Sequence, residues 1–338
     1  MNNEQQNVLT NQDDPILVVN NLTVDFSTDK GTVRAIDGIN FEVKAGETLA
    51  IVGESGCGKS VSSLSIMGLV PSPPGHIVED SSIKFKGKEL VGLSEKDYRK
   101  IRGNDISMIF QEPMTALNPV LKISTQMIDV IRLHNKMSKA QAKALAIEML
   151  TTVGIPSPES RINEYPHQLS GGMRQRVMIA MALSCGPDLL LADEPTTALD
   201  VTIQAQVMTE MVRLQKKLGM AVVLVTHDLG VVAESCQRVV VMYCGQIIEQ
   251  GPVEEIFANP QHPYTEGLLK SIPVVRDKKI ARLPTIEGMV PDLHNLPSGC
   301  RFVDRCQYAE QQCRTHRPQL SETTTHQVAC FNPLGDIL

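Results

Sequence analysis

The chain has 338 residues, of which 42% are hydrophobic and 21% are charged. These fractions are those of an ordinary globular protein and exclude a globally disordered or fibrous chain. At ~100–200 residues per domain, the length predicts two domains, or one large domain with an extension. The 38 acidic residues outnumber the 32 basic residues, which argues against a nucleic-acid binder because such proteins need a basic face.

The sequence has no apolar run that approaches the ~20 residues needed to cross a bilayer. Its first 14 residues, MNNEQQNVLTNQDD, are polar and lack the basic-then-apolar order of a signal peptide. We therefore expect residues 1–14 to be disordered and the chain to be cytosolic, so that any role at a membrane depends on partner proteins.

Residues 16–47 alternate between apolar and polar side chains on either side of a turn near Gly31, which predicts antiparallel strands. The next run, TLAIVG at residues 48–53, is typical of a buried strand in a parallel sheet. Residues 59–69 have helical character that stops before PSPPG, because proline and glycine break helices. Residues 112–175 are predicted to be mainly helical.

The second half of the chain alternates between strand and helix. Apolar runs at residues 188–193 and 221–228 predict buried strands, and a helix is expected between them at about 203–218. This alternation implies an α/β layer structure. Residues 238–251 predict a hairpin that turns at Cys244-Gly245.

Residues 53–60 read GESGCGKS and match the phosphate-loop pattern G-x-x-x-x-G-K-[ST]. Glycines allow successive main-chain N–H groups to point at phosphate oxygens, and the following helix adds its positive end. Lys59 is expected to contact the β- and γ-phosphates, and the Ser60 hydroxyl to bind Mg²⁺. The alternative is a chance glycine-rich turn. The predicted nucleotide contacts in this segment are Gly53, Ser55, Gly56, Cys57, Gly58, Lys59, Ser60 and Val61.

A second candidate site, formed by acidic residues, follows an apolar strand. The segment LLLADE at residues 189–194 ends in two carboxylates, and a carboxylate at a strand end beside a phosphate loop can hold Mg²⁺. We assign that role to Asp193 and the role of general base to Glu194. The alternative is an ordinary strand end with solvated acids.

Together with Leu169-Ser170-Gly171-Gly172-Met173, these motifs resemble the nucleotide-binding subunits of ABC transporters over about residues 16–255. The signature of that family usually reads LSGGQ, and Met173 departs from it. The resemblance implies that two subunits face head-to-tail, so that Ser170, Gly171 and Gly172 bind the ATP held by the partner. From the residues alone, Ser170 is more simply a helix cap.

Other positions match the same family. Gln111 resembles the Q-loop glutamine that senses Mg²⁺ and the attacking water, and Asp200 closes a segment that resembles the D-loop at the dimer interface. His227 resembles the switch histidine that contacts the γ-phosphate. Phe26 resembles the aromatic residue that stacks on adenine, although a core position on a strand is an alternative.

The resemblance implies a P-loop NTPase (RecA-like) α/β core with an antiparallel β subdomain, an inserted α-helical subdomain at about 112–175, and a small C-terminal extension. The expected division is an ATPase domain at residues 15–255 and an extension at 256–338. The expected cofactors are ATP and Mg²⁺.

The extension narrows the resemblance. His262-Pro263-Tyr264 and the cysteines after it look like the C-terminal extension of dipeptide and oligopeptide importer ATPases, and most closely like their D-type subunit. That subfamily implies a second, different ATPase subunit, two membrane permease subunits, an extracytoplasmic binding protein and a place on the cytoplasmic side of the bacterial inner membrane. The alternatives are an importer of nickel or another solute, a soluble ABC ATPase acting on nucleic acid or ribosomes, and a non-enzymatic docking subunit.

The extension holds four cysteines, spaced C-x5-C-x6-C-x16-C, in a compartment where disulfides are not expected. The paired knuckles typical of zinc sites are missing, and four thiolates can hold a [4Fe–4S] cluster, which the family's tails also imply. Zinc and free thiols remain alternatives. Arg301, Arg305 and Arg314 are expected to offset the charge of the cluster. The four predicted ligands are Cys300, Cys306, Cys313 and Cys330.

Overall fold

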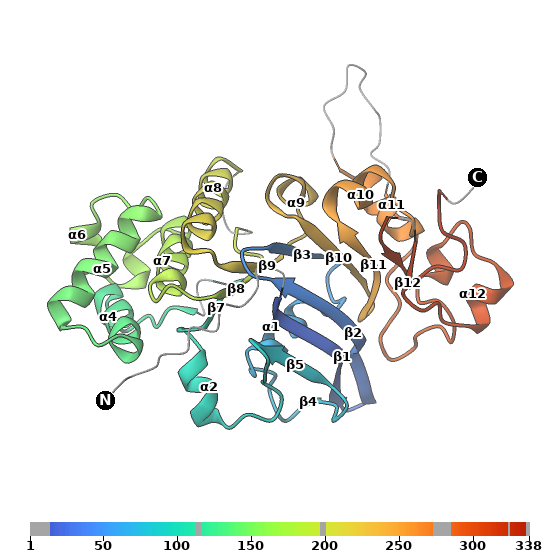
Figure 1. Ribbon diagram of the computed structural model, residues 1–338, viewed down its shortest axis with the longest axis horizontal. Coiled ribbons are helices and arrows are strands. Elements are labelled where there is room, and N and C mark those ends of the chain that lie inside the picture. Colours follow the sequence, from blue (N-terminus) through green and yellow to red (C-terminus); the bar gives the residue numbers. More distant parts are fainter. Residues whose placement is uncertain (1–13, 113–115, 197–200, 273–284, 324, 336–338) are drawn as a thin grey trace, which may run out of the picture.

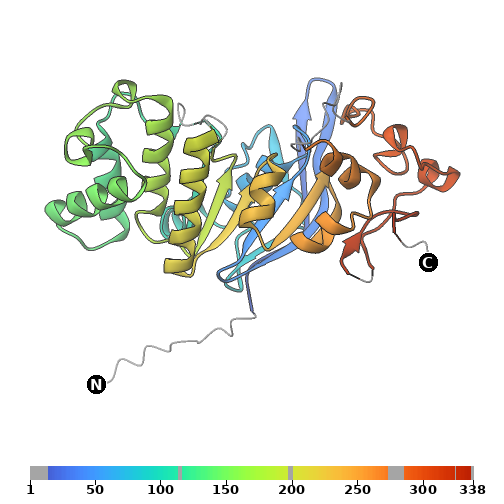
Figure 2. The same ribbon diagram turned by 90° about the horizontal axis from the view of Figure 1, so that it is seen from above.

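The computed structural model describes residues 14–112, 116–196, 201–272, 285–323 and 325–335. Apart from Asp14, the segment predicted to be disordered lies outside these residues. Figure 1 shows a group of helices at one end, two sheets in the middle and the C-terminal segments at the other end, and the turned view in Figure 2 keeps the same order.

The first sheet is antiparallel, as the alternating pattern predicts. Its strands β1 (Pro15–Thr28) and β2 (Gly31–Lys44) pair from Pro15–Lys44 to Thr28–Gly31. The strand order is β2-β1-β5-β6, with β4 also paired to β1. The three short strands are β4 (Gly75–Ile77), β5 (Ser82–Phe85) and β6 (Lys88–Glu89).

The second sheet has the order β12-β13-β11-β10-β3-β9-β8-β7. Its five strands from β10 to β7 are parallel, and every residue of β3, β8 and β9 is buried. The prediction of buried parallel strands is therefore confirmed. The strands are β3 (Thr48–Val52), β7 (Ile106–Ile109), β8 (Leu189–Asp193), β9 (Ala221–Val225), β10 (Arg238–Tyr243), β11 (Gln246–Pro252), β12 (Ser321–Glu322) and β13 (Gln327–Val328).

The parallel strands read as continuous apolar runs because each face of the sheet is covered. Leu189 and Leu191 of β8 join the core beneath the antiparallel sheet. Leu190 and Ala192 of the same strand join the core under the helical group. Side chains of a strand alternate between its faces, so one strand serves two hydrophobic cores.

The helices lie where the sequence places them, with shifted ends. The expected helix at 59–69 ends at Ile66, the expected strand at 221–228 ends at Val225, and the helical region runs past residue 175 to Leu183. None of the described helices has both the length and the apolar character needed to cross a membrane. The helices are α1 (Lys59–Ile66), α2 (Glu95–Ile101), α4 (Ile123–His134), α5 (Lys139–Thr152), α6 (Pro158–Arg161), α7 (Gly171–Leu183), α8 (Val201–Leu218), α9 (Leu229–Ser235), α10 (Val253–Ala258), α11 (Pro263–Lys270) and α12 (Gln311–Thr315).

The C-terminal extension packs directly against the second sheet. Strand β13 pairs with β11, and Tyr264 and Phe302 share a hydrophobic core with Val52 and Tyr243. The ring of Tyr243 lies 4.7 Å from that of Tyr264 and 5.3 Å from that of Phe302. The domain boundary near residue 255 stays a prediction, and it falls within α10 between two segments that share this core.

Candidate nucleotide-binding site

The phosphate loop joins β3 to α1 and fits tightly between neighbouring strands. Gly53 has φ 151°, and a Cβ atom there would lie 2.2 Å from the Met242 carbonyl oxygen. Gly58 precedes α1 with φ 103°, and its Cβ would lie 2.9 Å from the Ala35 carbonyl oxygen. Side chains are therefore excluded at both glycines, and the backbone alone lines this part of the loop.

Lys59 is held over the loop that precedes it. Its side chain is buried, and its Nζ donates to the carbonyl oxygens of Gly53 at 2.8 Å and Glu54 at 3.1 Å. The amine lies at the N-terminus of α1, where a helix already favours anions. Ser55 and Gly56 are exposed, Ser60 and Val61 are partly exposed, and Cys57 is buried beneath the loop.

Asp193 lies at the end of β8 beside Ser60. It is only 4% exposed; burial raises the pKa of this carboxyl, while a hydrogen bond from the Ser60 hydroxyl and the charge of Lys59 act in the opposite direction. Its Oδ1 is buried without a hydrogen-bond partner among the residues that the structure describes. The Ser60 hydroxyl and the Asp193 carboxylate, with its unsatisfied Oδ1, fit a Mg²⁺ ion because Mg²⁺ prefers oxygen ligands.

The Glu194 side chain, which follows β8, contacts Gln111 after β7 and His227 after β9. Its Oε2 lies 3.2 Å from Gln111 Nε2 and 3.5 Å from His227 Nδ1. Glu194 has φ 47°, a left-handed backbone that costs roughly 1–3 kcal/mol for a residue other than glycine. This convergence lies at the carboxyl edge of the parallel strands β7, β8 and β9, where α/β proteins bind ligands.

The remaining predicted residues are spread more widely. Phe26 is half-buried on β1, opposite Val33 of β2. Ser170 caps α7, because its Oγ accepts the Met173 N–H at 3.3 Å, and Ser170 and Gly171 are exposed. Gly172 follows in the first turn of α7, and α7 belongs to the helical group in Figure 1. Asp200 lies outside the described residues.

Sequence reasoning missed three contacts of this site. The buried side chain of Gln175, on α7, donates to the carbonyl oxygen of Pro195, which directly follows Glu194. The Tyr264 hydroxyl accepts the Glu54 N–H at 2.8 Å, and Arg305 forms an ion pair with the Glu54 carboxylate. No shared motif links these partners to the site, although Gln175 lies near the signature segment and Tyr264 belongs to the His262-Pro263-Tyr264 segment.

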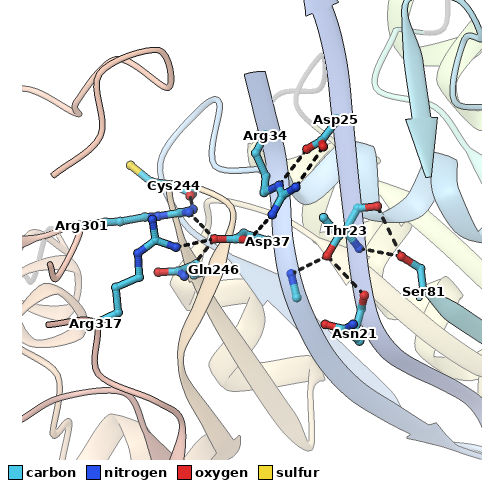
Figure 3. A network of polar contacts seen from close by, with 11 residues as sticks. Asn21, Thr23, Asp25, Arg34, Asp37, Ser81, Cys244, Gln246, Arg301 and Arg317 are labelled. Carbon is cyan, nitrogen blue, oxygen red and sulfur yellow. Dashed lines mark hydrogen bonds and ion pairs between the residues drawn. The ribbon is translucent and has the colours of Figure 1, made fainter. Parts of the chain in front are cut away.

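The arginines of the extension differ from expectation. Arg301 was expected beside the thiols, but it pairs with Asp37 on β2 and donates to the Cys244 carbonyl oxygen (Figure 3). Arg317, for which there was no expectation, pairs with the same Asp37. Arg305 pairs with Glu54, and Arg314 is exposed near Asp304. Arg301, Arg305 and Arg317 thus attach the extension to the nucleotide-binding half, whereas the pair of Arg314 and Asp304 lies within the extension.

The four cysteines of the extension line one small cavity with Val303 and Phe331. Its volume of about 20 Å³ is room for about one water molecule. Burial raises the pKa of Cys300 and of Cys330 to about 11 and also raises that of Cys306. Among the residues that the structure describes, three or more His, Cys, Asp or Glu side chains are nowhere arranged to hold a metal ion.

A glycine-rich loop between a buried parallel strand and a helix, beside an acidic strand end, defines a P-loop nucleotide-binding protein. Sequence comparison gives the particular family: residues 36–197 match the family described as ABC transporter, and residues 248–313 match that described as oligopeptide/dipeptide transporter, C-terminal region. The chain belongs to the ABC transporter ATP-binding proteins, as its motifs predict, and is an ABC-type ATPase.

The chain is similar to relatives along most of its length. It is 55% identical over 317 residues to the oligopeptide transport ATP-binding protein AppD of Bacillus subtilis, which covers 94% of this chain and 96% of AppD. It is 53% identical to the dipeptide transport ATP-binding protein DppD of the same organism, covering 94% of each chain. DppD of Haemophilus influenzae is 49% identical, covering 95% of this chain and 96% of DppD.

The fold is similar to solved ATP-binding cassettes, so the predicted fold class is confirmed. A dimeric cassette in a post-hydrolysis state, bound to ADP and Pi, matches with a TM-score of 0.64 and 28% identity, covering 70% of this chain and 98% of that one. The cassette cbiO1 of Clostridium perfringens matches with a TM-score of 0.59 and 31% identity, covering 72% and 91%.

Proposed function

We propose that this chain is the ATP-binding subunit of a membrane ABC transporter, and that it hydrolyses ATP to drive the import of dipeptides or oligopeptides. The observation that carries the proposal is the convergence of Gln111, Glu194 and His227 on the edge of the sheet that also holds the phosphate loop. The names of the relatives, oligopeptide and dipeptide transport ATP-binding proteins, support the peptide substrate.

Each residue of the site has a role in this proposal. The loop amides and Lys59 bind the β- and γ-phosphates, while Ser60 and Asp193 hold Mg²⁺, which neutralises phosphate charge when bound. Glu194 accepts the proton of the attacking water. Gln111 orients that water and the Mg²⁺ ligands, and His227 contacts the γ-phosphate. Phe26 stacks on adenine, a contact worth roughly 1–3 kcal/mol by analogy with base-stacking platforms.

The same proposal includes a second ATPase subunit. Ser170 caps a 13-residue helix that begins with Gly171 and Gly172, and the N-terminus of such a helix suits an anion. The phosphate loop of the same chain precedes a different helix, α1. A related subunit placed head-to-tail brings its ATP to the N-terminus of α7. The bridging phosphates close the two subunits, and hydrolysis releases them.

We place the chain on the cytoplasmic side of the inner membrane, bound to two permease subunits and acting with an extracytoplasmic binding protein. The helical region at about 112–175 transmits the movement. In support, large apolar side chains are exposed between β7 and α4: Phe110 at 36%, Val120 at 76% and Leu121 at 38%. Exposed apolar groups of this size favour a protein contact.

The proposal also assigns an iron–sulfur cluster to Cys300, Cys306, Cys313 and Cys330, with zinc as the alternative. Four soft thiol ligands around one cavity support it, but the cavity is smaller than a cubane cluster, so the thiols must separate to hold one. Iron, acid-labile sulfide and zinc are to be assayed after anaerobic purification. Cys306→Ser should lose the metal and Cys185→Ser should keep it; native protein without iron or zinc rejects the assignment.

The ATPase mechanism is tested in the assembled complex with Glu194→Gln and Lys59→Ala. The first variant should keep ATP and hold the closed state with hydrolysis reduced at least about a hundredfold, the lower end of the general-base contribution. The second should lose tight ATP binding. Unchanged hydrolysis in the Glu194 variant removes the assigned base, and an ATPase rate that peptide-loaded binding protein does not raise argues against peptide import.

A further inference from the structure

The second residue of the phosphate loop is held by the C-terminal extension. Arg305 donates from Nη1 to Glu54 Oε2 at 2.6 Å and from Nη2 to Glu54 Oε1 at 3.0 Å. The Tyr264 hydroxyl accepts the main-chain N–H of the same Glu54 at 2.8 Å. Two groups that lie more than 200 positions further along the chain thus fix both the backbone and the side chain of one loop residue.

The Arg305 guanidinium is itself rigidly positioned. Its side chain is 5% exposed, against 29% for Glu54, and its Nε donates to the Glu287 carbonyl oxygen at 3.0 Å. Nη1 also lies 3.3 Å from the Tyr243 hydroxyl. Paired forks of this kind are the strongest ion pairs in proteins because they fix geometry as well as charge.

The pair matters because of where Glu54 is. A carboxylate in a loop that binds phosphates repels its ligand, and that repulsion is strong where little water screens it. The carbonyl oxygen of Glu54 also accepts from Lys59 Nζ at 3.1 Å. Arg305 therefore neutralises a charge beside the phosphates and steadies the residue that orients the lysine.

We propose that Arg305 is a positioning residue for ATP binding, and that the extension is in this way a working part of the nucleotide site. This inference rests on the proposed role of the phosphate loop in binding ATP. Without Arg305, an unpaired negative charge remains on a residue of the phosphate loop, and of these two contacts with the extension Glu54 keeps only the one with Tyr264. ATP affinity falls, and the catalytic group Glu194, at the edge of the sheet, is left in place.

The test measures the Kd of Mg²⁺-ATP for the full chain by equilibrium dialysis. Arg305→Gln should weaken binding roughly tenfold, equivalent to about 1.4 kcal/mol. Arg314→Gln is the matched control, because Arg314 is an exposed arginine of the same extension, and it should stay within about twofold. Combining Arg305→Gln with Glu54→Gln should restore most of the affinity, because the unpaired carboxylate is then absent.

A charge effect also depends on salt. Between ~0.1 M and ~1 M salt the Debye length falls from ~10 Å to ~3 Å, so the ratio of Arg305→Gln to native Kd should shrink. A Kd within about twofold of native for Arg305→Gln overturns the proposal. So does a double variant that binds as weakly as Arg305→Gln, because the loss is then structural.

Two further variants separate folding from positioning. Should Arg305→Gln fail to fold, Tyr264→Phe removes only the hydroxyl that accepts the Glu54 N–H, and it should raise the KM for ATP in the complex about threefold with kcat unchanged. An unchanged KM overturns the proposal. Lys59→Ala tests separately the assumption that the phosphate loop binds ATP. If this variant binds ATP as tightly as the native chain, the proposed function of the loop fails, independently of the result for Arg305.

Discussion

Glu249 and His326 form a buried pair that joins the main sheet to the C-terminal extension. Glu249 Oε1 lies 2.7 Å from His326 Nε2, and neither side chain is exposed. The same carboxylate accepts the N–H groups of Gln261 at 2.6 Å and His262 at 3.1 Å. One side chain of β11 thus satisfies polar groups from two separate segments of the extension.

Removing that carboxylate should destabilise the protein strongly. Glu249→Ala removes the partner of His326 Nε2 and of the Gln261 and His262 N–H groups, and breaking a buried pair costs about 3–5 kcal/mol. We expect a decrease of that size in the free energy of unfolding, measured by urea denaturation. Glu322→Ala, at an exposed position of the extension, is the control and should change it by less than about 0.5 kcal/mol. A loss below about 1 kcal/mol for Glu249→Ala contradicts the prediction.

The second prediction concerns pH and His262. Burial lowers the pKa of His262 from 6.5 to about 4, and its Nδ1 accepts the Tyr264 N–H at 3.0 Å, which requires an unprotonated nitrogen. Between these two values the unfolded chain binds a proton that the folded chain does not. Stability is therefore present above about pH 6.5 and is lost as the pH falls toward 4.

The contribution of His262 can be isolated by substitution. At pH 5, ~1.5 pH units below the ordinary pKa of histidine, His262 should lower the unfolding free energy of the native chain by about 2 kcal/mol relative to pH 7. His262→Asn keeps a helix-capping acceptor without titrating. We expect its unfolding free energy to fall less between pH 7 and pH 5 than that of the native chain, by about that amount. Equal losses in the two proteins reject the assignment.

The third prediction compares two glycines with positive φ. At Gly53 an added Cβ would lie 2.2 Å from the Met242 carbonyl oxygen, whereas at Gly87, with φ 75°, it would meet nothing within 4 Å. Both alanine variants incur backbone strain of roughly 1–3 kcal/mol. Only Gly53→Ala also displaces the phosphate loop, so ATP affinity should fall at least about tenfold, or 1.4 kcal/mol.

Equilibrium dialysis with ATP checks this comparison, and thermal unfolding measures the strain separately. Gly87→Ala should be destabilised while its Kd for ATP stays within about twofold of native. Equal ATP affinity in the two variants shows that the contact with Met242 does not shape the loop.

Much of the fold follows from local patterns. The apolar runs of β3, β8 and β9 predict buried parallel strands, and the turn at Cys244-Gly245 predicts the hairpin of β10 and β11. These signals are readable because the alternation of faces along a strand and the conformational demands of glycine act over a few residues. Helix and strand ends were less well predicted, since capping contacts decide them.

The residues of the candidate site also fall into two groups: those that a local sequence pattern predicts and those that it does not. The phosphate loop was found from its own residues, because its chemistry needs glycines, a lysine and a hydroxyl at fixed spacing. Gln111 and His227 were assigned from family resemblance alone, and only the folded chain brings them within 3.5 Å of Glu194. Neither residue has a local pattern that distinguishes it from an ordinary polar residue after a strand.

By itself, the sequence determined that this protein is an α/β phosphate-loop protein with the motifs of an ABC ATPase. The tertiary structure decided how the extension is attached: Arg305 pairs with Glu54 and His326 with Glu249, instead of the arginines facing the thiols. The physical reason is the distance along the chain over which each feature is decided. Hydrophobic periodicity and loop geometry depend on neighbouring residues, whereas the partner of a charged side chain depends on which distant segments fold against each other.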